Sequence, residues 1–268
     1  MQEILPSETT EYADVVLPGA AFAEKVGTFT NTERRVQLVR KALDPPGGAR
    51  ADWEILCDLA KRIQKRMGMH GDDAPYASWD YAGPAEILEE IAALTPIYGG
   101  IRYDRIQEVG LQWPCPDVGH PGTQFLHAGK FSRGLGHFSA VEWLPPVEQP
   151  DEEYPLVLTT GRTLYHWHGG TMTRRSEGLN EIYPEARVEM NPLDARTLGV
   201  RDGDLVEVSS RRGKVTAKAQ VVAGPDAGVV FMTFHFKEAA ANLLTNPALD
   251  PVAKIPELKV CAVKVVPL

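Results

Sequence analysis

The densest group of side chains that could do chemistry lies in residues 159–175, TTGRTLYHWHGGTMTRR. This stretch combines threonine hydroxyls, two histidines, paired glycines and three arginines, and it directly follows a predicted buried strand at residues 156–160. Glycines let the backbone approach a ligand and expose its N–H groups, while Thr and Arg donate hydrogen bonds to phosphate oxygens. Trp167 adds a flat face for stacking. The loop therefore predicts a site for a phosphorylated aromatic ligand such as a nucleotide.

Other interpretations of the same residues are weaker. His166 and His168 are spaced as on a strand, but without a neighbouring cysteine or carboxylate the pair is poor support for a metal site. Arg174 and Arg175, taken alone, would form a solvated surface pair. Upstream, residues 24–35 are typical of a charged turn, and residues 112–127 of a structural loop. The prolines beside Cys115 remove N–H donors that would stabilise a thiolate, which disfavours a nucleophile there.

Composition excludes several classes of protein. The 268 residues include 28 Lys+Arg and 36 Asp+Glu, a net charge of −8, whereas nucleic-acid binding needs a basic face. No apolar run approaches the ~20 residues of a membrane span, and the first residues lack the pattern of a secretory signal. The cysteines Cys57, Cys115 and Cys261 are widely spaced, which disfavours a disulfide framework and a cysteine-built metal site. We expect reduced thiols and a cytoplasmic protein with no nucleic acid partner.

The chain has two halves that differ in their predicted secondary structure, and these must position the residues of the loop. The first half predicts an extended piece at residues 14–17, a helix at 52–67 capped by Asp52, and a second helix from Pro84 to before Pro96. Each helix has an apolar stripe expected in a core, comprising Trp53, Leu56, Leu59, Ala60, Ile63 and Met67 in one and Ile87, Leu88, Ile91 and Leu94 in the other. Residues 98–143 are loop-rich.

The second half begins after a Pro- and acid-rich segment, residues 145–155, which predicts an exposed linker. Strands are predicted at residues 156–160, 205–209, 215–222, 229–236 and 260–266, and a short helix lies between the cap Asn191 and Gly199. Closely spaced strands with one short helix predict a small closed barrel. The expected fold class is mixed α/β, a partial α/β domain followed by a small β-barrel.

Taken together, these segments resemble the C-terminal part of the catalytic subunit of molybdenum- or tungsten-dependent formate dehydrogenases. That subunit belongs to the bis-molybdopterin guanine dinucleotide oxidoreductases. The resemblance is carried by long, ordered motifs over essentially the whole chain, at residues 13–18 (ADVVLP), 24–37 (EKVGTFTNTERRVQ), 111–127, 160–175, 191–215 and 231–263.

The resemblance implies residues 1–144 as the C-terminal portion of the α/β domain with its long loop, and residues 156–268 as a double-psi-type β-barrel that binds the dinucleotide. The cofactor-binding residues it implies are Thr160, Gly161, Arg162, Thr163, His166, Trp167, His168, Gly169, Thr171, Phe234, Asn242 and Lys259. Arg162 would hold the pyrophosphate, Asn242 would bond to pterin nitrogens and Lys259 would balance charge. Gly169 departs from the family, which commonly has Thr at this position.

The resemblance also implies what must come from elsewhere. The family's cysteine motif for an iron–sulfur cluster, its Cys or selenocysteine metal ligand, and the His and Arg beside that ligand have no counterpart in this sequence. We therefore expect the Mo- or W-bis(molybdopterin guanine dinucleotide) to be shared with an N-terminal part of the same subunit, which would also hold the iron–sulfur cluster. Electron-transfer subunits are expected partners. The chain alone is predicted to be inactive.

Two alternatives remain open at this point. The periplasmic-type nitrate reductases show a similar HWH…TMTRR loop, although residues 13–37 and 112–123 look more like formate dehydrogenase. A non-catalytic assembly module that has lost the pterin is a different class. Retention of Arg162, His166, Asn242 and Lys259 argues against that loss.

Overall fold

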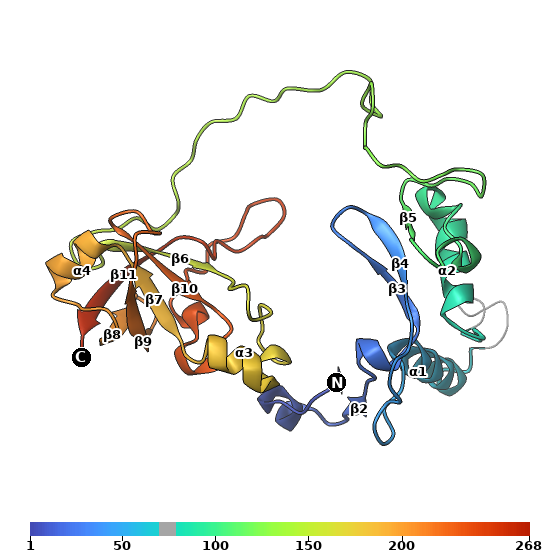
Figure 1. Cartoon of the computed structure of the whole chain (residues 1–268), viewed down its shortest axis with the longest axis horizontal. Coiled ribbons are helices and arrows are strands. Elements are labelled where there is room, and N and C mark those ends of the chain that lie inside the picture. The colour runs from blue at the N-terminus through green and yellow to red at the C-terminus, as the bar shows by residue number, and fades with distance from the viewer. Residues whose placement is uncertain (70–78) are drawn as a thin grey trace. The chain divides into compact units, whose positions relative to one another are not determined.

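The computed structural model describes residues 1–69 and 79–268 and divides the chain into two compact units, Met1–Phe138 and Ser139–Leu268. Unit 1 combines short strands with two helices, and unit 2 is built around a closed β-barrel (Figure 1). The predicted fold class is confirmed. The segment predicted as a linker, residues 145–155, lies inside unit 2. Among the described helices, none has both the length and the apolar character needed to cross a membrane.

The main sheet of unit 1 joins distant parts of the sequence. Strands β3 (Gly27–Thr30) and β4 (Arg35–Val39) form an antiparallel hairpin, and β4 also pairs with β5 (Leu111–Gln112). The charged turn predicted at residues 24–35 is therefore largely a strand and the tip of a hairpin. A second, parallel pair joins β1 (Gln2–Glu3) to β2 (Leu17–Pro18), so only the last residue of the extended piece predicted at 14–17 is in a strand.

The two predicted helices are present as α1 (Asp52–Arg66) and α2 (Pro84–Leu94), but their environment differs from the prediction. Ala51, not Asp52, is the N-cap of α1, and the Asp52 carboxylate is instead bound by Lys25 and Gln2. The expected core stripes are largely exposed, since no described part of the chain covers them. Exposed members are Leu56, Leu59, Ile63, Met67, Ile91 and Leu94, and Leu88 alone among the stripe residues is buried.

Shorter turns complete unit 1. The 3₁₀ segments are η1 (Glu8–Tyr12), η2 (Phe22–Glu24), η4 (Pro96–Tyr98) and η5 (Tyr103–Arg105). Its small core is made of Val36, Leu88, Ile101, Ile106 and Cys115.

Six strands close the barrel of unit 2, in the order β10-β6-β11-β8-β9-β7. They are β6 (Leu156–Gly161), β7 (Arg187–Met190), β8 (Leu205–Ser209), β9 (Lys214–Val221), β10 (Val229–Thr233) and β11 (Cys261–Pro267). The β6–β10 and β7–β9 pairs are parallel and the other four are antiparallel. Alternate side chains of these strands fill one apolar core, as expected for a closed barrel. Strand β7 was not predicted, and β10 ends three residues earlier than predicted.

Helices in unit 2 lie outside the strand ladder. They are α3 (Glu177–Ile182) and α4 (Pro192–Leu198). The predicted cap of α4 is confirmed, because the Asn191 side chain accepts a hydrogen bond from the Leu193 N–H at 2.9 Å. Gly199 ends the helix with φ of 70°, a conformation that favours glycine.

The register of the strands brings several chain segments to one end of the barrel. Because β6 and β10 are parallel, with Gly161 opposite Thr233, their carboxyl ends lie side by side. The start of β11 lies there too, since it is antiparallel to β6. Strand β8 is antiparallel to β11, so the β8–β9 turn is at the same end. We call this the loop end of the barrel.

Candidate functional site

Residues from three segments meet at the loop end. Thr160 is 2% exposed, and its hydroxyl donates to the Leu258 carbonyl at 2.6 Å. The Thr160 carbonyl accepts a hydrogen bond from Lys259 Nζ, which also lies 5.8 Å from the centroid of the Phe234 ring. The Thr160 side chain is therefore used within the protein, whereas Lys259 brings a positive charge to the start of the loop that follows β6.

His166 anchors this loop to the interior of unit 2. It is 3% exposed, with Nε2 3.0 Å from the Tyr183 carbonyl and Nδ1 3.1 Å from the Thr173 hydroxyl. A carbonyl oxygen only accepts, so Nε2 donates to Tyr183, and Nδ1 shares a hydrogen bond with the Thr173 hydroxyl. Both ring nitrogens are thus bonded to the protein. A contact between His166 and a pterin stays a prediction, and the geometry gives the ring a role in shaping the loop.

The remaining predicted loop residues lie on the outer surface. Thr163 is half-buried, and the exposed ones are Arg162, Trp167, His168, Gly169 and Thr171. Within residues 1–69 and 79–268, the side chains of Arg162, Trp167 and His168 have no hydrogen-bond or ion-pair partner. An unpaired guanidinium, indole and imidazole on one loop are donors available to a ligand.

Asn242 reaches the same end from another part of the chain. It is exposed on the 3₁₀ turn η8 (Ala241–Leu243). Arg212 in the β8–β9 turn holds this segment, because its Nε and Nη2 donate to the Leu244 carbonyl at 3.0 and 2.7 Å. Register and contacts thus gather the predicted site residues at the loop end, although only some of them face outward.

Three glycines of the loop differ in what surrounds them. A Cβ on Gly161 would lie 2.5 Å from the Phe231 ring, so a side chain there would displace that ring. Gly170 has φ of 65°, and its Cβ would meet the His235 carbonyl at 3.1 Å. Gly169 faces open space, with Thr171 Oγ1 the nearest atom at 3.7 Å. Gly169 could therefore carry the Thr that the resembled family has, whereas Gly170 is required by backbone geometry.

Sequence reasoning missed a buried cluster of rings behind the loop. His235 is 6% exposed, and its ring centroid lies 4.7 Å from that of His166 and 4.0 Å from that of Phe236. Burial first, and then the nearby His166 and Arg174, lower the pKa of His235 to about 4. Within the described residues its Nε2 has no hydrogen-bond partner. The signal available in the sequence was the FHF run, which we assigned to a longer strand.

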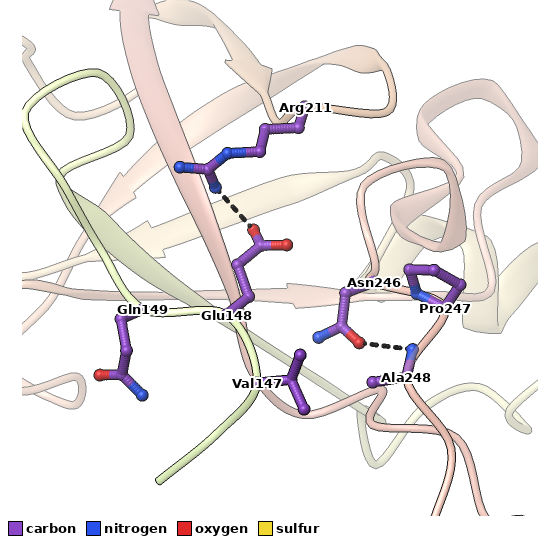
Figure 2. Close-up of a pocket in the computed structure, with 7 residues that line it drawn as sticks. All are labelled: Val147, Glu148, Gln149, Arg211, Asn246, Pro247 and Ala248. Carbon is purple, nitrogen blue, oxygen red and sulfur yellow. Dashed lines mark hydrogen bonds and ion pairs between the residues drawn. The ribbon is translucent and has the colours of Figure 1, made fainter.

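A pocket of about 450 Å³ lies beside the loop end, and Figure 2 shows its lining. Glu148 and Arg211 form an ion pair at 3.2 Å, and the Asn246 side-chain oxygen accepts from the Ala248 N–H at 2.9 Å. Val147, Gln149 and Pro247 complete the lining. None of the predicted site residues lines this pocket. Because its charged groups neutralise one another, we assign it no ligand.

In unit 1, Arg34 joins the two upstream clusters. It has φ of 68°, and its guanidinium donates to the carbonyls of Trp113, Thr123 and Gln124 and lies 5.4 Å from the centroid of the Trp113 ring. Cys115 is 0% exposed. A thiol so deeply buried cannot reach a substrate, and Arg34 ties the tip of the β3–β4 hairpin to the loop at residues 112–127.

The sequence matches two families of known proteins. Residues 156–262 match the family described as "Molydopterin dinucleotide binding domain", and residues 1–62 match "Molybdopterin oxidoreductase". The chain is 51% identical over 267 residues to the F420-dependent formate dehydrogenase subunit alpha of Methanocaldococcus jannaschii, covering 99% of this chain and 38% of that protein. It is 41% identical over 284 residues to a nitrate reductase of Symbiobacterium thermophilum, covering 97% of this chain and 36% of that protein.

One further relative and one solved structure are also similar to this chain. Formate dehydrogenase H of Escherichia coli is 34% identical over 274 residues, covering 100% of this chain and 37% of the relative. The chain thus spans under two fifths of the length of these relatives. Among solved structures, acetylene hydratase from Pelobacter acetylenicus is similar with a TM-score of 0.70 at 17% identity, over 96% of this chain and 38% of the other, which shows the fold alone. By its two matched regions, residues 1–62 and 156–262, the chain belongs to the molybdopterin oxidoreductase family and carries that family's dinucleotide-binding domain.

Proposed function

We propose that this chain is the part of a formate dehydrogenase alpha subunit that caps a Mo- or W-bis(molybdopterin guanine dinucleotide). The observation that carries the proposal is the set of outward, unpaired donors at the loop end of a dinucleotide-binding barrel. They suit such a group chemically, because a guanidinium matches a diphosphate and an indole face matches a fused heterocycle. The bound metal–pterin would supply the two-electron interconversion of formate and carbon dioxide, and the protein its binding and orientation.

Each loop-end residue then has a distinct role. Arg162 binds the pyrophosphate together with backbone N–H groups of the loop. Trp167 stacks on a ring system, with His168, Thr163 and Thr171 donating around it. Asn242 bonds to pterin nitrogens from the η8 side. Thr160, Gly161 and Phe234 form the floor of the site, and Lys259 contributes positive charge.

The rest of the activity is proposed to come from other segments and subunits. We assign the iron–sulfur cluster and the residues around the metal to an N-terminal part of the same subunit, on the same or a separate polypeptide. Electron-transfer subunits would take up the electrons in a cytoplasmic complex. The relative at 51% identity is named as F420-dependent, so F420 is the acceptor we propose. Reduction of F420 by formate, measured in the complete complex, tests this assignment.

Formate is favoured over nitrate by similarity. Three F420-dependent formate dehydrogenase alpha subunits are 48–51% identical to this chain, whereas two nitrate reductases are 36% and 41% identical and formate dehydrogenase H of Escherichia coli is 34% identical. A complete complex that reduces nitrate with an artificial donor, and leaves formate unoxidised, would reverse this choice. An assembly module without cofactor is disfavoured, because the outward donors would then have no ligand.

The decisive experiment uses the complete complex that contains this chain. Denatured protein is analysed for oxidised pterin fluorescence and released guanine nucleotide. The proposal fails if neither is found in pure wild-type complex.

Arg162→Ala then tests the binding role directly. Losing a charge-assisted phosphate contact should cost about 1.5–3 kcal/mol of cofactor affinity and lower the guanine nucleotide content. Arg201→Ala is the matched control, because Arg201 is an exposed arginine that precedes β8 at the opposite end of the barrel. Wild-type nucleotide content in Arg162→Ala would refute the assigned role.

A further inference from the structure

The loop after β6 has an inner side that is tied to the segment following β10. Arg174 lies in the 3₁₀ turn η6 (Thr173–Arg175), and its guanidinium makes a bidentate ion pair with Glu238 of η7 (Lys237–Ala239), at 3.0 Å from Nη1 and 2.9 Å from Nη2. The same guanidinium lies 4.7 Å from the centroid of the Phe236 ring. Two-point pairing and stacking fix the orientation of an arginine more strictly than a single contact.

Arg174 is much less free than a solvated surface residue. Its side chain is 25% exposed. The hydrogen bond from Arg174 is the largest cause of the lowered pKa of Glu238, so the glutamate carries its charge at neutral pH. The weaker alternative of a solvated surface pair therefore does not describe Arg174, because the chain folds back and supplies the Glu238 carboxylate.

The loop itself is packed against this arginine. The backbone N–H of Arg174 donates to the Gly170 carbonyl at 2.9 Å. The Arg174 side chain lies close to the same glycine, since a Cβ on Gly170 would be 3.0 Å from Arg174 Cδ. Gly170 in turn donates to the Trp167 carbonyl at 2.9 Å, and the Trp167 N–H donates to Thr173 Oγ1 at 3.2 Å. A chain of short contacts thus runs from Glu238 through Arg174 and Gly170 to the residue that presents the indole.

We infer that Arg174, held by Glu238, is a positioning residue that sets the conformation of residues 162–171 for the dinucleotide. It acts through the loop backbone and touches no ligand itself. This inference rests on the proposed function, because the loop must have a dinucleotide to receive. Loop conformation can nevertheless be measured without that ligand, which separates the two ideas.

The first test is amide hydrogen exchange on the 268-residue chain without cofactor. In Arg174→Gln, exchange at Trp167 and Gly170 should rise about fivefold, as expected for loss of a partly exposed ion pair and its ordered geometry. Amides of the barrel core, such as Val188 and Val206, should keep their wild-type rates. The reversed pair R174E/E238R should return the loop rates toward wild type. Lys214→Gln, which removes another ion pair of unit 2, the more exposed Lys214–Glu207 pair at 2.8 Å, is the control.

The second test uses the complete complex, with released guanine nucleotide as the readout. Arg174→Gln should lower nucleotide retention, R174E/E238R should restore at least half of the loss, and Lys214→Gln should leave retention unchanged. Unaltered loop exchange, or exchange raised equally across the barrel, would overturn the positioning role. Retention unchanged in Arg174→Gln would overturn it as well, and leave the proposed function intact. A wild-type complex without guanine nucleotide would overturn the proposed function, and this inference with it.

Discussion

The loop after β6 uses neighbouring residues for opposite purposes. The His166 ring points inward, and both of its nitrogens are hydrogen-bonded to protein groups. The Trp167 and His168 side chains are exposed and have no partners among the described residues. The inward histidine packs on a second buried histidine, His235. The two rings are tilted by 31°, and burial with His166 and Arg174 nearby disfavours a charge on His235, which makes this cluster sensitive to acid.

His235 should make the stability of unit 2 depend on pH. Its folded pKa of about 4 lies below the ordinary value of 6.5, through burial and the proximity of His166 and Arg174, with Glu238 opposing. An unfolded histidine takes up a proton below pH 6.5, whereas the folded one does not until about pH 4. Stability is therefore complete above pH 6.5 and falls between pH 6.5 and 4, by at most about 3 kcal/mol.

Urea unfolding of the chain at pH 7 and pH 4.5, for wild type and His235→Gln, measures this effect. The variant should lose most of the difference between the two pH values. His137→Gln, at an exposed histidine, should retain the wild-type difference. An undiminished pH dependence in His235→Gln would exclude His235 as its source.

At the residue scale, the sequence located the outward residues better than the inward ones. Arg162, Trp167 and His168 belong to a local motif whose composition alone suggests a ligand. Arg174 and His235 act through partners 64 and 69 residues away, Glu238 and His166. No local pattern encodes such a pairing, so it emerges only when β10 places its following segment beside the loop.

Between elements, Glu148 fastens the segment before β6 to the barrel. Its carboxylate accepts the Ala262 N–H at 2.7 Å and pairs with Arg211 and Arg212, and its side chain is 12% exposed. Strand β8 pairs with β11 only from Lys264 onward, which leaves the Ala262 N–H without a strand partner. Glu148 fills that place, so the predicted exposed linker is in part an integral segment of unit 2.

Glu148→Gln should destabilise unit 2 by about 2–3 kcal/mol, because two arginines lose a largely buried counter-charge. Burial would raise the pKa of Glu148, but bonds from Arg212 and Ala262 outweigh it and leave the pKa lowered. This contribution is present above the unfolded pKa and lost as pH falls through the folded one. The midpoint of urea unfolding measures it, with Glu152→Gln, at an exposed residue, as control. Equal midpoints for both variants would contradict the fastening role.

Element prediction succeeded where the local signals were complete. The α4 helix has its cap, its first-turn proline and its final glycine in sequence, and β8 alternates apolar and polar residues from Val206 to Ser209. Strand β7 was not predicted from the sequence, because it is short and its two apolar residues alternate with Arg187 and Glu189. It is a strand through its pairing with β9 and β10, which is a property of the closed barrel.

At the scale of the whole chain, the spacing of apolar residues predicted which face of α1 is apolar. It did not predict whether another part of the molecule covers that face. Leu56, Leu59, Ile63 and Met67 lie on that face and are 44–68% exposed. Amphipathic spacing reports that a face prefers burial, and it carries no information on the partner. Unit 2 is different, because its core closes on itself and includes residues from all six strands.

The connection between the units should be the first site of proteolysis. Around the boundary at Phe138, residues 124–145 are exposed, with Leu135 91% and Phe138 98% exposed, and no helix or strand is longer than an isolated bridge. Proteases cut exposed segments of the chain that can unfold locally at little cost in free energy.

Limited trypsin digestion should therefore cut first after Lys130 or Arg133, both exposed. The fragment from Gly134 to Leu268 should then resist further digestion and unfold cooperatively, because it retains the complete barrel and Glu148. Mass spectrometry of the first products identifies the cleavage site. Initial cleavage within residues 156–267 would show that the barrel is not the independent, stable unit that its closed core predicts.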